Sequence, residues 1–251
     1  MSTVTMPDRT LTYSHQTADP TFAWRSTEGA ALSASDPTFA ARVLTAKTVA
    51  VRTQVSLEAS QDIPGFGTQI SNAYSKAFAA AIDLAGIRGE SPQPTGLHTT
   101  SGVGTVTSVG LPTTYDELVD GVAVFLNANN SLNELTGIVM HPTIWSIYQK
   151  LKTGISSDNT PLELPPAIAD IPQFVTTNAD DATLSPEAWH VVLGNFNDLV
   201  LGVRMNPTIR ILDQTTSMAS NLLVEIVGVA RLDFLVTRPA SFVRLEDVTT
   251  A

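Results

Sequence analysis

A regular alternation of apolar and polar residues begins at residue 49 and predicts a β-strand followed by a long helix. In the strand, Val49, Val51, Thr53 and Val55 lie on one side, with Ala50, Arg52, Gln54 and Ser56 on the other. The helix, about 62–85, carries apolar residues at spacings of three and four, which place them on one face: Phe66, Ile70, Ala73, Ala77, Ala81 and Leu84. Gly86 and Gly89 are expected to end it, because glycine adopts left-handed backbone angles at low cost. A long strand beside a long helix predicts a stiff, elongated element.

A second helical region is expected after the Gly-, Ser- and Thr-rich residues 98–113, which read as a connection between subdomains. Thr114 and Glu117 have the spacing of a capping box, so the helix is predicted to begin at Thr114. Its buried face is predicted to hold Leu118, Val122 and Phe125, with Leu126 at the margin. Residues 138–140 predict a short buried strand, and Pro142 is placed at the first turn of the next helix, where its missing N–H costs nothing.

The last quarter of the chain is dominated by strand patterns. Strands are predicted at 189–193, 198–205, 208–212, 221–236 and 242–245. The apolar run Leu222–Val227 indicates burial on both faces. Because helices and strands come in blocks and do not alternate strictly, the pattern predicts an α+β fold.

The first 47 residues have a different character, rich in Thr, Ser and Ala. Such a segment cannot fill a core of its own. Its aromatic residues nevertheless include Phe22, Trp24 and Phe39. Isolated aromatics in a polar segment usually dock against another surface. We therefore predict an extended hairpin that lies on a neighbouring molecule and uses these three residues as contacts.

The composition favours a protein whose surface is covered by partners. Hydrophobic residues make up 43% of the 251 residues and charged residues only 15%, against about 25% in typical proteins. A surface poor in charge suggests contacts with other copies. The net charge of −10 argues against nucleic-acid binding as the main task, since that needs clustered Lys and Arg. An acidic wall would repel enclosed DNA; alternatively, the acidity only aids solubility.

The sequence offers no recognisable catalytic, cofactor or metal site. There is no cysteine, which excludes disulfides and thiolate chemistry. Gly102, Gly104 and Gly110 lack the spacing of a phosphate-binding loop, so a flexible connector is favoured. The four histidines show no metal-binding spacing, and His141 is best explained as part of a helix cap. We expect no cofactor and no metal.

The chain also lacks the signals of membrane insertion or export. It has no run of 18 apolar residues, and Met1–Gln16 is polar and unlike a signal peptide. We expect a soluble protein that is made inside the cell and does not enter a membrane.

Several short segments, taken in order, carry a resemblance to a known family. They are Phe22-Ala23-Trp24, Thr27-Glu28-Gly29-Ala30, Ser35-Asp36-Pro37-Thr38-Phe39, Val55-Ser56-Leu57-Glu58, Gly86-Ile87-Arg88-Gly89, Pro94-Thr95-Gly96-Leu97, Val139-Met140-His141-Pro142, Leu151-Lys152, Val192-Leu193-Gly194-Asn195-Phe196 and Arg238-Pro239-Ala240-Ser241-Phe242-Val243. Each is short and built from common residues, but together they extend over some nine-tenths of the chain. In this order they resemble the major capsid proteins of tailed bacteriophages, which share the Hong Kong 97-type capsid fold.

The resemblance implies an α+β fold with an extended loop, a long spine helix, and peripheral and axial subdomains. It divides the chain into an N-terminal segment and extended loop (1–47), a peripheral subdomain with the spine helix (48–113), an axial subdomain (114–228) and strands that return to the peripheral subdomain (229–251). The extended loop of this family is a two-stranded finger that reaches across an adjacent subunit.

The implied function is a structural subunit that forms the pentamers and hexamers of an icosahedral phage head enclosing double-stranded DNA, without sequence-specific binding. Portal, scaffold or decoration proteins would be further partners, and the protein would be made in the bacterial cytoplasm and reside in the virion. An alternative with the same fold is an encapsulin-like bacterial compartment. A third alternative, a small-molecule enzyme, would need a convergent polar pocket for which the sequence supplies no candidate.

Two features depart from the family's pattern. The founding member joins subunits by an isopeptide bond between a finger lysine and an asparagine, whereas the first lysine here is Lys47, after the finger. Asn221 lies near the expected acceptor position but has no donor, so a shell without these covalent links is expected. Met1 also begins almost at the extended loop, which suggests a truncated or processed form, or assembly that relies on a separate scaffold.

Overall fold

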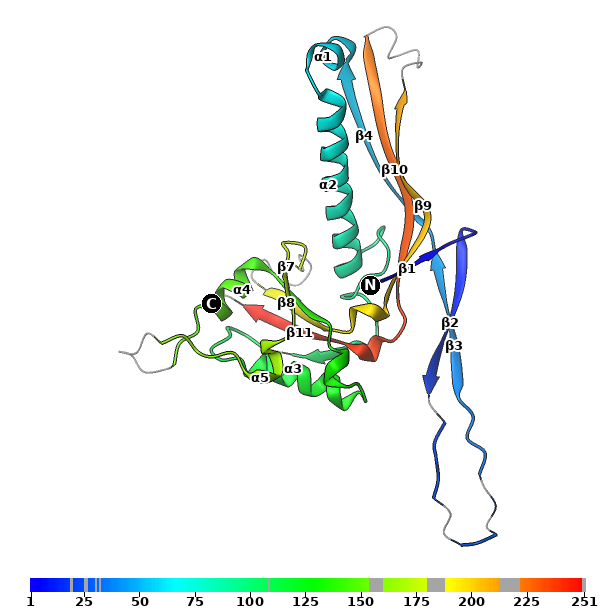
Figure 1. The fold of residues 1–251 in the computed structure, drawn as a ribbon, viewed down its shortest axis with the longest axis vertical. Coiled ribbons are helices and arrows are strands. Elements are labelled where there is room, and N and C mark those ends of the chain that lie inside the picture. The colour runs from blue at the N-terminus through cyan, green and yellow to red at the C-terminus, as the bar shows by residue number, and fades with distance from the viewer. Residues whose placement is uncertain are drawn as a thin grey trace.

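The computed structural model describes residues 1–249 apart from 19, 25–26, 30, 32, 108, 154–159, 180–187 and 213–221. Figure 1 shows an elongated molecule with three parts: a tall sheet with a long helix beside it, a more compact unit, and a hairpin pointing the opposite way. The strands form a four-stranded sheet, a five-stranded sheet and a two-stranded hairpin. We call the first two parts, with their helices, the four-strand unit and the five-strand unit, and residues 10–45 the hairpin.

The four-strand unit is built on the order β1-β9-β10-β4. Its strands are β1 (Ser2–Thr5), β4 (Lys47–Ser56), β9 (Leu199–Leu212) and β10 (Leu223–Val236). β10 pairs antiparallel with both β4 and β9, and β1 pairs parallel with β9. The alternation predicted in β4 is visible in its burial, since Val49, Thr53 and Val55 are half-buried between exposed neighbours. Val51, on the same side, remains 41% exposed, which shows that this face is not fully covered within one subunit.

The long helix α2 (Phe66–Ile87) follows a short helix α1 (Leu57–Asp62) and stands beside β4 and β10 (Figure 1). The prediction that Gly86 ends the helix is wrong. Gly86 is a buried helical residue, and a Cβ there would come within 3.2 Å of the Phe234 ring, so glycine lets the helix approach β10 closely. Gly89 makes the turn with φ +63, and a Cβ there would lie 1.8 Å from the Gly96 nitrogen, which no other residue could accommodate.

The predicted apolar stripe of α2 is only partly the buried one. Phe66, Ile70, Ala81 and Leu84 are half-buried, whereas Ala73 and Ala77 are exposed, so this middle part of the stripe is wrong. The middle of the buried face is formed by Tyr74 and Phe78, one position further along. Tyr74 was not among the predicted stripe residues, and its hydroxyl donates to the Ile226 backbone oxygen at 3.0 Å. The ring can therefore be buried with its polar atom satisfied.

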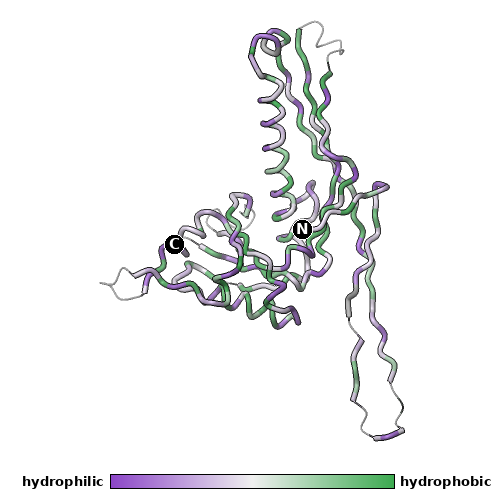
Figure 2. The backbone as a smooth tube through the Cα atoms, in the orientation of Figure 1, coloured by the Kyte–Doolittle hydropathy of each residue, from purple (hydrophilic) through white to green (hydrophobic). Residues whose placement is uncertain are grey.

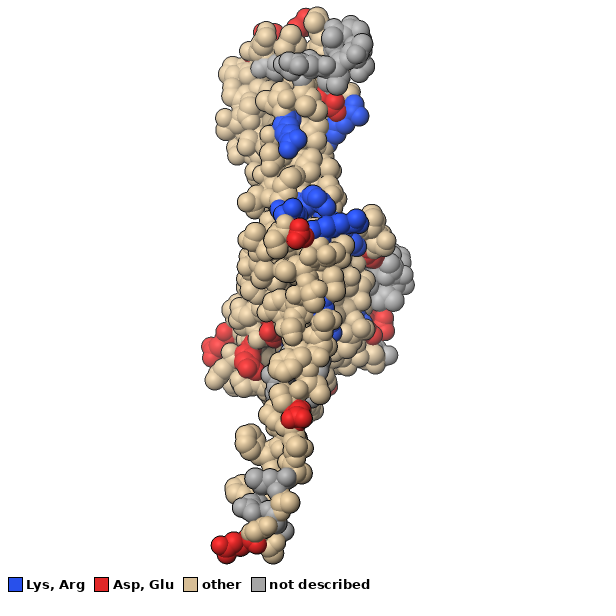
Figure 3. Space-filling model, turned by 90° about the vertical axis from the view of Figure 1, so that its right-hand side faces the viewer, with Lys and Arg blue, Asp and Glu red and all other residues tan. Residues whose placement is uncertain are grey.

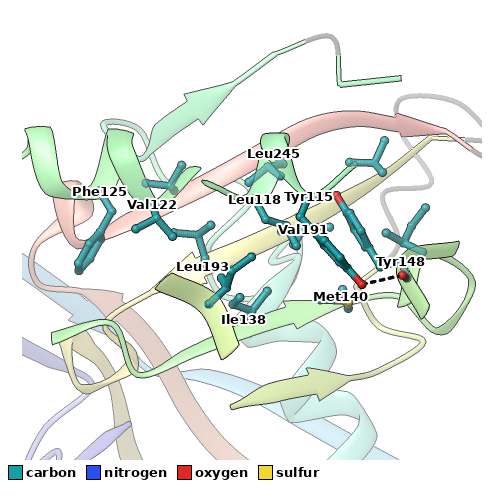
Figure 4. Packing of buried hydrophobic residues seen from close by; sticks show 14 of the residues in the cluster. Tyr115, Leu118, Val122, Phe125, Ile138, Met140, Tyr148, Val191, Leu193 and Leu245 are labelled. Atoms are coloured by element: carbon teal, nitrogen blue, oxygen red, sulfur yellow. Dashed lines mark hydrogen bonds between the residues drawn. The ribbon is translucent and has the colours of Figure 1, made fainter. Parts of the chain in front are cut away.

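The five-strand unit has the strand order β5-β11-β8-β6-β7. Its elements are β5 (Gly104–Val106), α3 (Asp116–Asn127), β6 (Gly137–Met140), α4 (Pro142–Gln149), α5 (Pro166–Ala169), β7 (Gln173–Val175), β8 (Ala188–Gly194) and β11 (Phe242–Thr249). Figure 4 shows the core, in which α3 lays Leu118, Val122 and Phe125 against the sheet. These three predicted positions are buried, and Leu126 is 41% exposed. The buried strand predicted at 138–140 is confirmed as β6.

At the helix ends of this unit, one prediction is wrong and two are confirmed. α3 begins one residue later than predicted, with Tyr115 as its N-cap, and the Thr114 hydroxyl accepts from the Asp116 amide at 3.2 Å in place of a capping box with Glu117. The predicted cap at His141 is confirmed, because its Nδ1 accepts from the Thr143 amide at 3.2 Å. Pro142 occupies the first turn of α4, as predicted.

The sheets divide the chain differently from the predicted boundaries at 113/114 and 228/229. β9, from within 114–228, pairs with β10 in the four-stranded sheet, which also contains β4 and β1. β11 was predicted to return to the peripheral part, but it pairs with β8 and β5 in the five-stranded sheet. The chain therefore crosses between the units several times, and the strands predicted at 198–205 and 208–212 are one continuous strand. Short local patterns carry no information about which strands pair over long separations.

Candidate assembly surfaces

The base of the hairpin is fixed to the four-strand unit by a small hydrophobic core. Its strands are β2 (Thr10–Ala18) and β3 (Thr38–Thr45), which pair antiparallel from Thr10↔Thr45 outward. The core buries residues from both parts: Met6, Leu44, Ala46, Val200 and Leu235. The Ala46 amide also donates to the Arg9 carbonyl oxygen at 2.8 Å. The hairpin therefore leaves the body of the molecule at a defined position.

A buried carboxylate strengthens the same junction. Asp233 on β10 accepts hydrogen bonds from the Thr45 amide at 2.5 Å through Oδ2 and from the Phe234 amide at 2.9 Å through Oδ1. Burial raises the pKa of Asp233, and the two amides together with Lys47 act in the opposite direction. This residue links the end of β3 directly to the central strand of the sheet, and no sequence motif indicated it.

Beyond its paired strands the hairpin opens into a long loop. Strand pairing ends at Ala18↔Thr38, and most of the described residues between them have no regular structure, with a turn near Thr27–Gly29 where Gly29 has φ +83. One hydrogen bond, from the Thr21 amide to Ser35 Oγ at 2.8 Å, joins the two sides of the loop. Figure 1 shows this loop projecting far from both sheets.

The three predicted contact residues of the hairpin are all exposed. The exposed fractions are 95% for Phe22, 101% for Trp24 and 64% for Phe39. Figure 2 shows hydrophobic stretches along the hairpin as well as within the two sheets. Fully exposed large aromatic side chains are costly in water and are typical of surfaces that are covered by a partner. Their exposure agrees with a docking role, which remains a prediction.

Charged residues are sparse on the face of the molecule that carries the hairpin. Figure 3 shows Lys and Arg gathered mainly about halfway along the molecule and at the upper sheet, and acidic residues scattered from the top of the molecule to the far end of the hairpin, with uncharged surface over most of the rest. The described residues of the loop include two acids, Glu28 and Asp36. One ion pair, between Arg52 and Glu225, lies on the four-stranded sheet.

Three of the four histidines make packing contacts. His98 and His190, far apart in the sequence, pack edge to face with ring centroids 4.8 Å apart and are both buried. His141 stacks on Trp189 at 5.6 Å. Within the part of the chain that the structure describes, no group of three or more metal-ligating side chains lies close enough together to hold an ion.

A buried polar cluster near the start of α3 also has a structural explanation. The Tyr115 hydroxyl donates to the Tyr148 backbone oxygen at 2.9 Å, and the two rings stack at 5.8 Å (Figure 4). Burial raises the pKa of Glu117, with Asp116 and Asp120 acting in the same direction. Burial also raises the pKa of Tyr148 and of Tyr115. Tyr115 and Tyr148 belong to the core of the five-strand unit. Their contact connects α4 to the start of α3.

The residues relevant to covalent linkage are placed as follows. Lys47, the first lysine, lies at the base of the hairpin, and its Nζ donates to the Gln93 backbone oxygen. Asn221 lies outside the described residues. A shell without isopeptide links therefore stays a prediction.

Of the helices in the described ranges, none combines the length and the apolar character that a membrane-spanning helix requires.

Comparison with known proteins identifies the fold and the family. The phage capsid family model matches residues 1–247. A chain from the capsid of a native GTA particle computed with C5 symmetry has a TM-score of 0.78 at 16% identity, covering 99% of this chain and 88% of that chain. A chain from Mycobacterium phage Ogopogo has a TM-score of 0.73 at 16% identity, covering 97% and 89%, and one from Gordonia phage Cozz has 0.73 at 17%, covering 96% and 83%.

No curated protein sequence is significantly similar to the chain. The matches confirm the predicted Hong Kong 97-type capsid fold and favour a phage capsid over an encapsulin-like compartment. Because the family model spans almost the whole chain, the protein belongs to the phage capsid family and is a structural major capsid protein.

Proposed function

We propose that the protein assembles into pentamers and hexamers of an icosahedral phage head that encloses double-stranded DNA. The observation that carries this proposal is the hairpin loop, whose aromatic residues Phe22 and Trp24 are almost wholly exposed on a subunit of the capsid family. The GTA capsid similar to this chain was computed with C5 symmetry, which supports five-fold rings as one assembly product. Closed symmetry repeats each contact many times, so that individually weak contacts give a stable shell.

Each subunit would give the shell a stiff plate and an arm that overlaps the adjacent subunit. Helix α2, of 22 residues, and the long antiparallel pair β9 and β10 form a stiff plate, while the hairpin is held at its base by Leu44 and Asp233. An anchored base and an uncovered loop are the properties of an arm that holds a neighbour in position. We infer that the loop lies across an adjacent subunit and uses Phe22, Trp24 and Phe39 as contacts.

The shell would hold the DNA by enclosing it. A net charge of −10 gives the wall little attraction for phosphates, so the DNA would be held by the closed shell and not by sequence-specific binding. We propose a virion location after synthesis in the host cytoplasm, no enzymatic activity, and portal, scaffold or decoration proteins as further partners of the shell.

The test of the hairpin's role uses the replacement Trp24→Ala. Because Trp24 touches little of its own chain, the isolated subunit should fold as before, with unchanged circular dichroism and melting temperature, while the yield of particles falls. Trp24→Phe is the matched control, since it retains an aromatic contact and should retain most of the yield. Particle yields for Trp24→Ala equal to those of the wild type would contradict the assignment.

A further inference from the structure

A polar hollow lies where the base of the hairpin meets the four-strand unit and the segment that follows α2. Its volume is about 450 Å³, and its walls come from β3, the start of β4, residues 95–101 and the end of β10. Two cationic side chains line it, Arg42 on β3 and Lys47 at the start of β4. The hollow therefore brings a charged residue of the hairpin and one of the sheet to the same space.

Neither cation is neutralised by a salt bridge. Among the described residues, no ion pair includes Arg42 or Lys47. The Lys47 Nζ donates to the Gln93 backbone oxygen, and an ammonium group has further N–H donors beyond this one. Arg42 is half-buried, and its planar guanidinium presents a fork of N–H donors that matches the geometry of a carboxylate or phosphate. Both side chains can therefore bind an additional acceptor.

Asp233 is the one acidic residue among the described residues that line the hollow. It is 6% exposed, and its carboxylate already accepts hydrogen bonds from the amides of Thr45 and Phe234. Two positive charges thus meet one buried negative charge, so the lining has an excess of positive charge. This sign favours an anionic ligand and disfavours a metal cation.

Hydroxyl groups on the wall formed by residues 95–101 add hydrogen-bond donors. Thr95 and Ser101 line the hollow and are exposed, and their hydroxyls have no hydrogen-bond partner among the described residues. A hydroxyl can rotate to donate to an acceptor that arrives. Arginine, lysine and hydroxyl side chains are the donors that proteins use for phosphate oxygens. The chemistry of the lining therefore fits a small oxyanion.

The segment that carries these hydroxyls is held in place by its own hydrogen bonds. Thr99 Oγ1 donates to the Gly89 oxygen and accepts from the Gly96 amide, both at 3.1 Å. The Leu97 amide donates to the Gly86 oxygen at 3.0 Å, which fixes the segment to the end of α2. Donors on a fixed segment lose little conformational freedom when a ligand binds, so less of the binding free energy is lost.

We propose that the hollow is a binding site for a small oxyanion of the phosphate class, held by Arg42, Lys47 and the hydroxyls of Thr95 and Ser101. Arg42 belongs to the hairpin and the other three residues to the body of the subunit, so a bound ion joins the hairpin to the body. The ion adds a second polar link beside the one that Asp233 makes to β3. The inference goes beyond the proposed function and is tested on unassembled subunits.

Thermal melting in sodium phosphate and in sodium chloride of equal ionic strength tests the site. Phosphate also stabilises proteins in general by exclusion from their surface, but all variants share that contribution. With phosphate at several times the dissociation constant, the difference between the two salts should be about 2–4 °C larger for the wild type than for Arg42→Gln or Lys47→Gln.

Arg210→Gln and Lys76→Gln are the matched controls, because each removes an exposed positive charge that does not line the hollow. Both should keep the full difference. Each variant is compared with itself in two salts, so a general loss of stability does not affect the result. Equal differences in the wild type and in all four variants, or equal losses in the controls, would overturn the proposal.

Isothermal titration with inorganic phosphate separates this site from a general attraction of anions. Asp233→Asn removes the one acid of the described lining and retains an acceptor oxygen for the amides, so it should bind phosphate more tightly than the wild type. Unchanged or weaker binding by this variant would contradict the assigned position of the ion. A short single-stranded oligonucleotide is the second probe. If it binds and inorganic phosphate does not, the surface attracts nucleic acid and the proposed ion site is wrong.

Discussion

The hairpin loop and the five-strand unit use the same residue types in opposite ways. In the five-strand unit Phe125 is 0% exposed and Leu118 2%, in a core closed by residues of helices and strands. In the loop Phe22 is 95% exposed and Trp24 101%. A large aromatic side chain stabilises a subunit only where that subunit buries it. The difference separates residues that fold the subunit from residues that are available to join subunits.

The base of the hairpin lies between these two extremes. Leu44 is fully buried and Asp233 is 6% exposed, although the loop that they support is open to solvent. The structure thus places an uncovered loop on a well-fixed base. This arrangement lowers the entropic cost of binding a neighbour, because the direction of the arm is already set.

The largest predicted effect contrasts two chemically identical changes. Phe125→Ala should lower the free energy of unfolding by about 3–5 kcal/mol, because it leaves a cavity in the core of the five-strand unit. Phe22→Ala should change it by less than about 0.5 kcal/mol, since almost none of the ring is buried. Urea unfolding of unassembled subunits measures both. A comparable loss in the two variants would show that the loop packs on its own subunit.

A smaller effect is expected at the base of the hairpin. Asp233→Ala should lower the free energy of unfolding by about 1–3 kcal/mol, because it leaves the buried amides of Thr45 and Phe234 without their acceptor. Asp233→Asn retains one acceptor oxygen and should lose less. Hydrogen exchange gives a local readout, in which the Thr45 amide should exchange faster in the alanine variant. Unchanged protection of Thr45 in that variant would show that the carboxylate does not hold the hairpin.

The smallest predicted effect is a change in pH dependence within the five-strand unit. Burial raises the pKa of Glu117 above its ordinary value of 4.5, so its ionised form is less favourable in the folded than in the unfolded chain. The stability associated with this group is therefore present below pH 4.5 and is lost as pH rises through the higher folded pKa.

The variant Glu117→Gln cannot ionise at this position, so it should not lose stability as pH rises through the folded pKa of Glu117. The variant should be more stable than the wild type at pH 7 and equally stable at pH 4 in urea unfolding. Asp116→Asn, at the exposed neighbouring position, controls for removal of one acidic charge from this helix end. A gain in Glu117→Gln that is the same at both pH values would contradict the assigned cause.

Much of the local structure could be predicted from the sequence. The strand at 49–56, the long helix, the buried strand at 138–140 and the helix cap at His141 follow from short-range periodicity and capping chemistry, and all are present. The α+β class and the capsid fold also followed, the latter from the order of short segments. The exposed positions of Phe22, Trp24 and Phe39 match an arm without a core of its own.

The errors share a physical cause, which is dependence on contacts distant in the sequence. Gly86 reads as a helix end, but the ring of Phe234 determines that glycine is needed inside the helix. Tyr74 is absent from the predicted stripe, and its burial depends on the distant Ile226 carbonyl, which accepts a hydrogen bond from its hydroxyl. The pairing of β11 with β8, and the junction made by Asp233, likewise depend on strands that no local pattern connects.

Electron microscopy of the purified protein, with reconstruction of the particles it forms, tests the central claim most directly. The account predicts closed shells in which the hairpin of each subunit crosses onto a neighbour and Trp24 is covered by it. Solitary subunits with residues 10–45 folded back onto their own body would contradict it.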